Sequence, residues 1–382
     1  YAKSFGVMIV DEAHSYMNIQ SKTCRSICSI YAKNKWLLSG TLFSEPRPEN
    51  VLGFYKMIND FKFPDNLPSV KRHITMDKTY KGVMPKLVHR KDNEMFINKP
   101  KLIKNIVNIK LSEYEEKCYC KLKDIIVQTY KDIENAKLFN KEEYKKLNSQ
   151  LLGMIIHLRL FIVSPMLVMA KMYLGVIDTD NANDIYKVYK KHMNQQEMFN
   201  YFDNEENIKS TRIKKILETI NKHSNERVIV FSSFRKTLDY IKPLIDSRKI
   251  YCVESKHSNS KRGEILEEYS KDPNGILLLT YALGSDGLNL QSASTVLLMD
   301  VWWNDSKSKQ SIARAYRYGQ TKNVNVYMYV SNTKIEEAIY DKHSDKNSIV
   351  EELMKGNVST KIKTMKMKEI IQILEQPVRV KY

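Results

Sequence analysis

Residues 11–14, Asp-Glu-Ala-His, directly follow an apolar run and form a carboxylate pair suited to phosphate chemistry. Asp11 can hold Mg²⁺ through water, while Glu12 can polarise an attacking water molecule. The alternative is that two acids at the start of a helix only complement the helix dipole. Phosphoryl transfer also requires cationic groups at the γ-phosphate, and these must come from elsewhere in the chain.

Candidate cationic groups stand near the other end of the chain. Gln310, Arg314 and Arg317 have i, i+4 and i+7 spacing, which predicts a single helical face. Two guanidinium groups on one face are suited to gripping phosphate. Taken alone, such a pair in a basic protein indicates a solvated helix face. The pair follows two apolar runs and a glycine-containing turn, however, and this context favours the phosphate-binding interpretation.

Predicted parallel strands must position these groups. Residues 5–11 form a predicted buried strand, and residues 35–39 form the next strand after a helix at 21–31. In the second half of the chain, the runs at 275–280 and 295–300 are predicted to be buried strands of another parallel sheet. Each strand delivers polar residues at its carboxyl end, the edge where ligands bind in open α/β sheets. The predicted fold class is therefore α/β.

The same patterns divide the chain into four predicted regions. Residues 1–60 form the C-terminal part of one α/β lobe, and residues 210–335 form a second, doubly wound lobe. Residues 61–209 lack alternating strand signals, so they are predicted to be a helical insertion and linker, with helices at 113–133 and 142–163. The remainder, residues 336–382, is predicted to be a basic helical tail.

Composition narrows the class of partner. The formal net charge of +18 favours a polyanionic partner such as nucleic acid. No apolar run approaches the length of roughly eighteen residues that indicates a membrane span, so we expect no membrane partner. The five cysteines form neither a CxxC pair nor a cluster with zinc spacing, which predicts a reduced intracellular protein without structural zinc. The chain opens at Tyr1 and enters a strand almost at once, so we expect an N-terminal portion ahead of it.

Five segments stand in the order of helicase motifs II to VI: Asp11–His14, Ser39–Thr41, Val228–Ser232, Gly284–Leu290 and Gln310–Arg317. In this order and spacing the chain resembles the Swi/Snf family of DNA-dependent ATPases, in helicase superfamily 2. Arg-Tyr-Gly-Gln at 317–320 is similar to the ending of the family's motif VI. Trp302, Trp303 and Asn304 resemble a branch that includes repair translocases and a transcription-termination ATPase. The helix around Leu158 and Arg159 matches a family landmark more loosely.

The resemblance implies two RecA-like lobes, the first of them incomplete, and roles for individual residues. It implies catalytic roles for Asp11, Glu12, Gln310, Arg314 and Arg317, with Asp11 as the magnesium residue. Coupling between the lobes is implied for His14, Ser39, Gly40 and Thr41. Nucleotide binding is implied for Gly284, Asp286 and Gly287, and DNA binding for Ser232, Thr280, Asn289 and Trp303. The family's phosphate-binding loop belongs ahead of residue 1, so we expect residues 1–382 alone to hydrolyse ATP negligibly.

The expected function is that of an ATP-driven translocase that tracks the backbone of double-stranded DNA, with ATP and Mg²⁺ as cofactors and nucleoprotein complexes as further candidate partners. Two alternatives remain open. One is a strand-separating DNA or RNA helicase, and the other is a DNA-binding scaffold that does not hydrolyse ATP. The expected location is intracellular, in the nucleus or a viral replication compartment, and we do not expect the protein to be secreted.

Overall fold

The computed structural model describes residues 4–40, 48–58, 66–70, 100–139, 141–170, 189, 209–246, 248–285, 287–303, 305–342 and 367–376. The chain divides into two compact units, and each is described by itself. The first unit comprises Tyr1–Asn98, Trp303–Ser306 and Asp341–Thr364. The second unit comprises Lys99–Trp302, Lys307–Tyr340 and Met365–Tyr382. Both units contain parallel sheets, which confirms the predicted α/β class.

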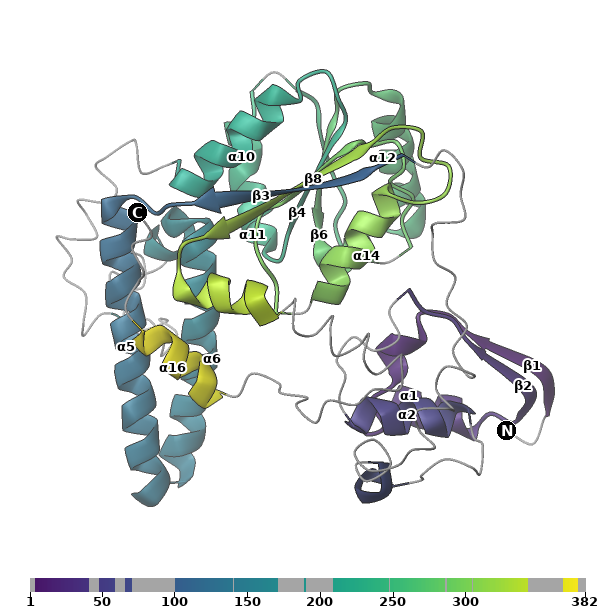
Figure 1. The fold of residues 1–382 in the computed structure, drawn as a ribbon, viewed down its shortest axis with the longest axis horizontal. Helices are drawn as coiled ribbons and strands as arrows, with labels where there is room; N and C mark the ends of the chain where they lie inside the picture. The colour runs from purple at the N-terminus through teal and green to yellow at the C-terminus, as the bar shows by residue number, and fades with distance from the viewer. Residues whose placement is uncertain are drawn as a thin grey trace. The chain divides into compact units, whose positions relative to one another are not determined.

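The first unit begins with a strand, a helix and a second strand, as predicted (Figure 1). Strand β1 (Phe5–Val10) pairs in parallel with β2 (Ala32–Leu37), so that Val10 faces Leu37 at the carboxyl ends. Helix α1 (Lys22–Ser29) lies between them in sequence, and α2 (Pro48–Ile58) follows. The hydroxyl of Ser21 accepts the N–H of Cys24 at 3.1 Å and so caps α1.

The prediction that β1 is buried was wrong. The side chains of Phe5, Val7 and Ile9 are 48%, 54% and 63% exposed. The core of this unit lies instead where α2 packs against the segment after β1, with Met17 and Tyr55 buried in it. Among the described residues this sheet has two strands.

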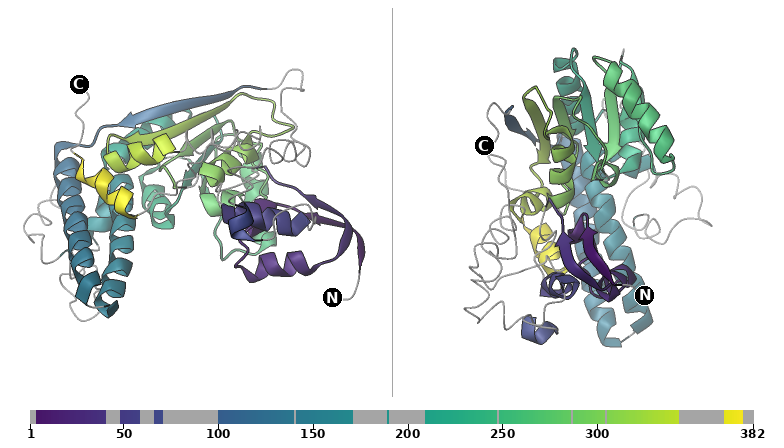
Figure 2. Two further views of the ribbon diagram at one scale, coloured as in Figure 1. Left: turned by 60° about the horizontal axis from the view of Figure 1, so that its bottom comes forward. Right: turned by 90° about the vertical axis from the view of Figure 1, so that its right-hand side faces the viewer.

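The second unit is built on a six-stranded parallel sheet of order β3-β8-β7-β4-β6-β5 among the described residues (Figures 1 and 2). Its strands are β3 (Leu102–Ile109), β4 (Val228–Ser232), β5 (Ile250–Cys252), β6 (Ile276–Thr280), β7 (Thr295–Leu298) and β8 (Val324–Ser331). The central strands are mostly apolar, with polar residues only at their ends, because both faces of the sheet are covered.

Two layers of helices cover this sheet, and alternate residues of each strand point to one layer or the other. Helices α12 (Asn259–Lys271) and α14 (Asp305–Ala315) pack on the face that carries Phe231. Helices α10 (Thr211–Lys222) and α11 (Arg235–Ile241) pack on the face that carries Val230. Burying each such side chain contributes about 1.5–3 kcal/mol, so this sheet is the main core of the unit.

Strand β3 corrects the expectation that no strand lies between residues 61 and 209. It pairs with β8 along its whole length, from Leu102 opposite Val324 to Ile109 opposite Ser331. As an edge strand it has one neighbour in the sheet, and Ile106 is 49% exposed. An edge strand does not need an alternating apolar pattern, and Lys104 and Asn105 interrupt it here.

A helical hairpin of α5 (Glu113–Phe139) and α6 (Lys141–Val163) extends the second unit (Figure 1). Both helices were predicted, and α5 continues further than the sequence indicated. Helix α16 (Met367–Glu375) packs on α5 and buries Ile370, Ile371 and Leu374. Within the described ranges, no helix is long and apolar enough to cross a membrane. The four-region division made from sequence stays a prediction.

Candidate functional site

The two acids of the Asp-Glu-Ala-His segment stand at the carboxyl end of β1. Oδ1 of Asp11 accepts the backbone N–H of Glu12 at 2.8 Å, and the Asp11 side chain is exposed. Glu12 has a φ of 48°, in the left-handed region. That conformation costs about 1 kcal/mol for a residue with a side chain. Such local strain is typical of functional sites, and here it turns the chain sharply at the end of the strand.

His14 and Ser39, separated by 25 residues in sequence, meet at the ends of β1 and β2. Nδ1 of His14 lies 2.8 Å from the hydroxyl oxygen of Ser39 and 3.4 Å from Oε2 of Glu12. A backbone bond of 2.9 Å from the N–H of Ala13 to the carbonyl of Leu38 holds the two strand ends together. The structure therefore joins the segments predicted as motifs II and III. Gly40 follows in a bend, and Thr41 lies outside the described residues.

His14 is held in its neutral form. Burial lowers the pKa of His14, and the charge of Glu12 opposes this only in part. A neutral imidazole has one N–H donor, and the contact with the Ser39 hydroxyl uses Nδ1. The arrangement links a carboxylate, an imidazole and a hydroxyl in one short chain.

The exposed carboxylates fit a magnesium ion. Mg²⁺ is bound in nucleotide sites by one or two carboxylates together with phosphate oxygens and water. Asp11 offers an exposed carboxylate, and Glu12 follows it directly. In the part of the chain that the structure describes, no three His, Cys, Asp or Glu residues form a closed metal cluster. The donor set suits a nucleotide-bound metal better than a structural one.

In the second unit the arginine segment differs from its prediction. Gln310 and Arg314 lie one turn apart on α14 and are half-buried. Helix α14 ends at Ala315, so Arg317 is not on the helix and the expected three-residue helical face was wrong. The helix ends ahead of Gly319, which has a φ of 95°. Arg317 therefore stands exposed in the turn that follows the helix.

The side chain of Gln320 fixes this turn. Its Nε2 donates to the carbonyls of Gln291, Ala293 and Ala315 at 3.0, 3.0 and 3.1 Å. Its Oε1 accepts the N–H groups of Thr321 and Lys322, each at 3.0 Å. One amide thus satisfies backbone groups from two loops. The sequence identified Gln320 only as the end of a motif, because the partners of its amide are distant in the chain.

The glycine-rich segment after β6 is partly a packing site. A Cβ on Gly284 would lie 2.4 Å from the ring of Phe231 and 2.7 Å from the hydroxyl of Ser311. Only glycine therefore allows α13 (Tyr281–Ser285) to pack against β4 and α14. Gly287 is exposed with a φ of 79°, and Asp286 lies outside the described residues. The nucleotide-binding roles of these residues stay predictions.

Of the four residues predicted to bind DNA, Ser232 and Thr280 are partners at the carboxyl ends of β4 and β6. Ser232 is fully buried, and its hydroxyl donates to Oδ2 of Asp300 at 2.6 Å. The structure thus gives the Ser232 hydroxyl a partner inside the protein and places it away from the surface where DNA was expected. Thr280 and Trp303 are half-buried and Asn289 is exposed, and their roles stay predictions.

Asp300 joins the ends of three strands, which sequence reasoning did not identify. Besides Ser232, it accepts the backbone N–H of Ser233 at 2.9 Å and the Ser233 hydroxyl. Its backbone carbonyl accepts the hydroxyl of Tyr281 at 2.8 Å. Burial raises the pKa of Asp300, and the hydrogen bonds from Ser232 and Ser233 oppose that rise. The carboxyl ends of β4, β6 and β7 are thereby held as one layer.

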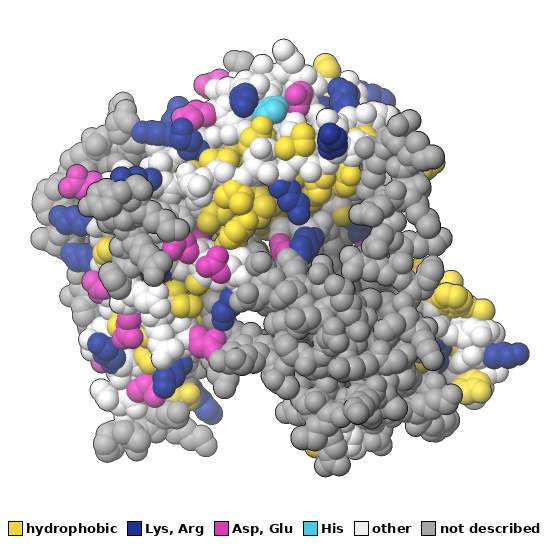
Figure 3. Space-filling view, in the orientation of Figure 1, with side chains coloured by type: hydrophobic (Ala, Val, Ile, Leu, Met, Phe, Trp, Pro, Cys, Tyr) yellow, Lys and Arg dark blue, Asp and Glu magenta, His cyan; other side chains and the backbone are white. Residues whose placement is uncertain are grey.

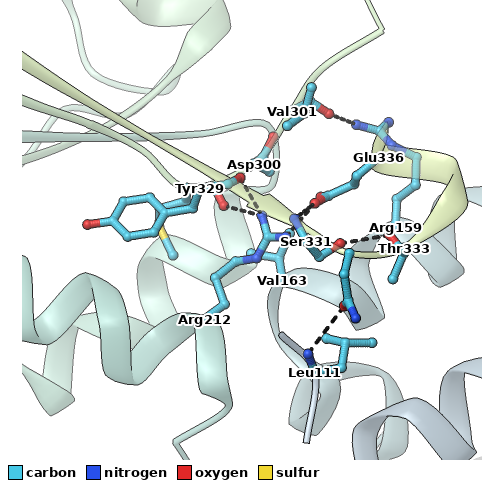
Figure 4. Close-up of polar contacts among 12 residues, drawn as sticks. Leu111, Arg159, Val163, Arg212, Asp300, Val301, Tyr329, Ser331, Thr333 and Glu336 are labelled. Atoms are coloured by element: carbon cyan, nitrogen blue, oxygen red, sulfur yellow. Dashed lines mark hydrogen bonds and ion pairs between the residues drawn. The ribbon is translucent and has the colours of Figure 1, made fainter. Parts of the chain in front are cut away.

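A buried ion pair lies beside this layer (Figure 4). Arg212 of α10 contacts Oε2 of Glu336 at 2.5 Å and donates to the carbonyls of Met299 and Tyr329 at 2.8 and 3.1 Å. Both side chains are almost fully buried. A buried charge is tolerated only when it is paired and hydrogen-bonded, and this pair meets that condition. The sequence does not indicate this ion pair, because an arginine in the first turn of a helix, such as Arg212, is typically solvated.

A parallel sheet with polar residues at its carboxyl edge, and an Asp-Glu-x-His strand end in a second α/β unit, define a helicase-type α/β protein. The SNF2-related domain matches residues 2–167, and the helicase conserved C-terminal domain matches residues 209–319. The chain thus carries an SNF2-related domain and a helicase conserved C-terminal domain, and its relatives include Swi/Snf ATPases, which confirms the resemblance seen in sequence.

Individual relatives are distant. The chain is 23% identical to the "Uncharacterized ATP-dependent helicase MG018" of Mycoplasma genitalium, over 98% of this chain and 33% of that protein. It is 27% identical to the "ISWI chromatin-remodeling complex ATPase ISW2" of Saccharomyces cerevisiae, over 89% of this chain and 29% of that protein. A solved Sulfolobus solfataricus SWI2/SNF2 ATPase core in complex with dsDNA is 18% identical, with a TM-score of 0.49, over 97% of this chain and 73% of that one. The chain thus spans about a third of the length of these curated relatives.

Proposed function

We propose that the protein is an ATP-dependent translocase that moves along the backbone of double-stranded DNA. The observation that carries the proposal is the junction at the ends of β1 and β2, where His14 contacts both Glu12 and Ser39 and Asp11 stands directly before Glu12. Acids at a strand end suit ATP hydrolysis, and the link to Ser39 gives the neighbouring strand a contact that responds to the nucleotide. The matches to the SNF2-related domain and to the helicase conserved C-terminal domain support the same activity.

In this proposal residues from both units have roles in ATP hydrolysis. Asp11 would hold Mg²⁺, which supplies neutralisation of charge on the phosphates when it is bound. Glu12 orients and polarises the attacking water, and Arg314 and Arg317 stabilise negative charge on the transferred group. Gln310 lies one turn before Arg314 on the same helix and shares its site.

The proposed partner is duplex DNA, contacted through its phosphates. The net charge of +18 supplies long-range attraction. Figure 3 shows Lys and Arg side chains scattered over one face, with Asp and Glu among them. This spread supports contact with a few phosphates at a time and little selectivity for sequence. The name of the yeast relative supports nucleoprotein complexes as further partners and the nucleus as a location.

Substitutions at Glu12 and Arg317 test the proposal in the full-length protein. Glu12→Gln should keep ATP binding and abolish hydrolysis, because the amide cannot polarise water. Arg317→Ala should lower the rate by roughly 10³-fold if the guanidinium stabilises the transition state. DNA-stimulated ATPase rates and nucleotide affinity are the measurements.

Matched controls are Glu264→Gln, an exposed acid on α12, and Lys322→Ala, an exposed base near Arg317. Both should leave the rate within twofold. A rate close to wild type in Glu12→Gln would contradict the catalytic role of Glu12. A wild type that binds DNA but shows no DNA-stimulated hydrolysis would support the non-hydrolysing scaffold instead. Displacement of one strand from a duplex would support the strand-separating helicase.

A further inference from the structure

The guanidinium group of Arg159, on helix α6, is buried against later residues of the second unit, and Figure 4 shows its bond to Val301. Its Nη2 donates to the carbonyl of Val301 at 2.7 Å. The guanidinium carbon lies 4.7 Å from the ring centre of Trp302 and 5.8 Å from that of Phe234. The two rings meet edge to face at 80°, with centres 6.4 Å apart. Arg159 is 3% exposed, so these contacts replace water around the cation.

Such a contact requires the planar guanidinium. Burial lowers the pKa of Arg159, and the negative charge of Asp300 opposes that change. A delocalised cation can stack on aromatic rings and still donate in its own plane, whereas a lysine ammonium is a point charge that cannot do both. The geometry therefore fixes the position of the Val301 carbonyl relative to α6.

The fixed segment leads directly to the proposed catalytic helix. Val301 and Trp302 lie between the end of β7 and the start of α14 at Asp305. On one side, Asp300 is held by Ser232 and Ser233. On the other side, Arg159 holds Val301. The start of α14, and with it the direction in which Arg314 leaves the sheet, thus depends on a contact from the α5–α6 hairpin.

We propose that Arg159 is a positioning residue for ATP hydrolysis, which joins the helical hairpin to the helix that carries Gln310 and Arg314. The proposal rests on the proposed function. Arg159 itself is buried against protein and does not touch the nucleotide. Its effect is on the orientation of α14, so removing it should slow the chemical step more than it weakens ATP binding.

The test compares Arg159→Met and Arg159→Lys with wild type in the full-length protein, with saturating duplex DNA. Arg159→Met should lower kcat by about tenfold or more while KM for ATP stays within about twofold. Arg159→Lys should recover only part of the loss, because the charge returns without the planar contact. The thermal unfolding midpoint is measured for every variant.

Arg248→Met is the matched control for losing an arginine that supports backbone. Arg248 donates to the carbonyls of Asn274, Ile220, His223 and Glu226 ahead of β5, at the opposite edge of the same sheet. It should lower the unfolding midpoint at least as much as Arg159→Met and leave kcat within about twofold. If kcat instead follows the unfolding midpoint in both variants, Arg159 is a packing residue and the proposal is overturned.

A second pair of variants covers the case in which Arg159→Met does not fold. Trp302→Ala keeps the bond from Arg159 to Val301 and removes the ring, and it should lower kcat with KM unchanged. Trp302→Phe keeps a ring for the cation and should restore most of the rate. If the wild type hydrolyses ATP and both Arg159→Lys and Trp302→Ala keep its kcat, this proposal alone is overturned. A wild type without DNA-stimulated hydrolysis overturns the proposed function, and this proposal with it.

Discussion

Single residues at the end of β1 differ in their surroundings, and this difference separates their roles. Asp11 is exposed and Glu12 is about one-third exposed, at 34% of its side chain, whereas His14 is buried. Exposure leaves the two carboxylates accessible to a metal or to water. Burial keeps the imidazole neutral and suited to a directed hydrogen bond with Ser39. The acids are therefore placed for chemistry, and the histidine for contact between strand ends.

The burial of His14 predicts a stability change on the acidic side of neutrality. Its folded pKa is lowered, so the unfolded chain takes up a proton first, at a pH of about 6.5. The contribution of neutral His14 to the free energy of unfolding is therefore complete above that pH. It is lost as the pH falls from about 6.5 through the lower pKa of the folded state. Each unit of difference between the two pKa values corresponds to about 1.4 kcal/mol. Chemical unfolding of wild type and His14→Asn between pH 5 and pH 8 measures it. Equal pH slopes for the two proteins would show that His14 does not contribute.

Helix packing, at the scale of elements, decides where glycine is required. Gly284 lies where α13 approaches β4 and α14, and a Cβ there would overlap the Phe231 ring. Gly263 lies within α12 and has nothing within 4 Å of the position of a Cβ. The two glycines are both helical, but only the first is required by its neighbours.

This contrast predicts opposite effects of the same substitution. Gly284→Ala should lower the free energy of unfolding by about 1–3 kcal/mol, because the ring and the Ser311 hydroxyl must move. Gly263→Ala should raise it by about 0.5–1 kcal/mol, because alanine restricts the unfolded chain and favours the helix. Urea unfolding of both variants checks the pair. A loss of stability in Gly263→Ala, or none in Gly284→Ala, would contradict this account of the packing.

The whole molecule carries a large positive charge. The net charge is +18, and the basic side chains are interspersed with acidic ones on the face shown in Figure 3. A single DNA track therefore meets only a fraction of the lysines and arginines. Phosphate contact of this kind positions a protein on DNA without reading its bases.

Salt dependence measures the number of those contacts. If about four to seven phosphates are neutralised, log K against log salt should have a slope of roughly −4 to −6 for duplex DNA. The measurement is affinity across a salt series on two duplexes of unrelated sequence, with the full-length protein. A flat response, or a tenfold preference for one duplex, would count against a motor that tracks the backbone.

Sequence alone determined the features that depend on local pattern. The apolar runs predicted β1, β2 and β4 to β8. For β4, β6 and β7 the reason is that a strand buried on both faces needs an apolar sequence. Helical periodicity predicted α5, α6 and α10, because a helix packed on one side repeats its apolar residues with the period of the helix. The order and spacing of the five motifs predicted the family by resemblance.

Tertiary structure decided what depends on partners far away in the chain. Strand β3 is a strand because β8, more than two hundred residues later, supplies its hydrogen bonds. Arg159 finds the Val301 carbonyl across 142 residues, and Arg212 finds Glu336 across 124. Arg317 leaves the helical face because Gln320 closes the turn on two loops. These contacts have no periodicity in sequence: a buried arginine and a solvated one look alike until the fold removes the water around one of them.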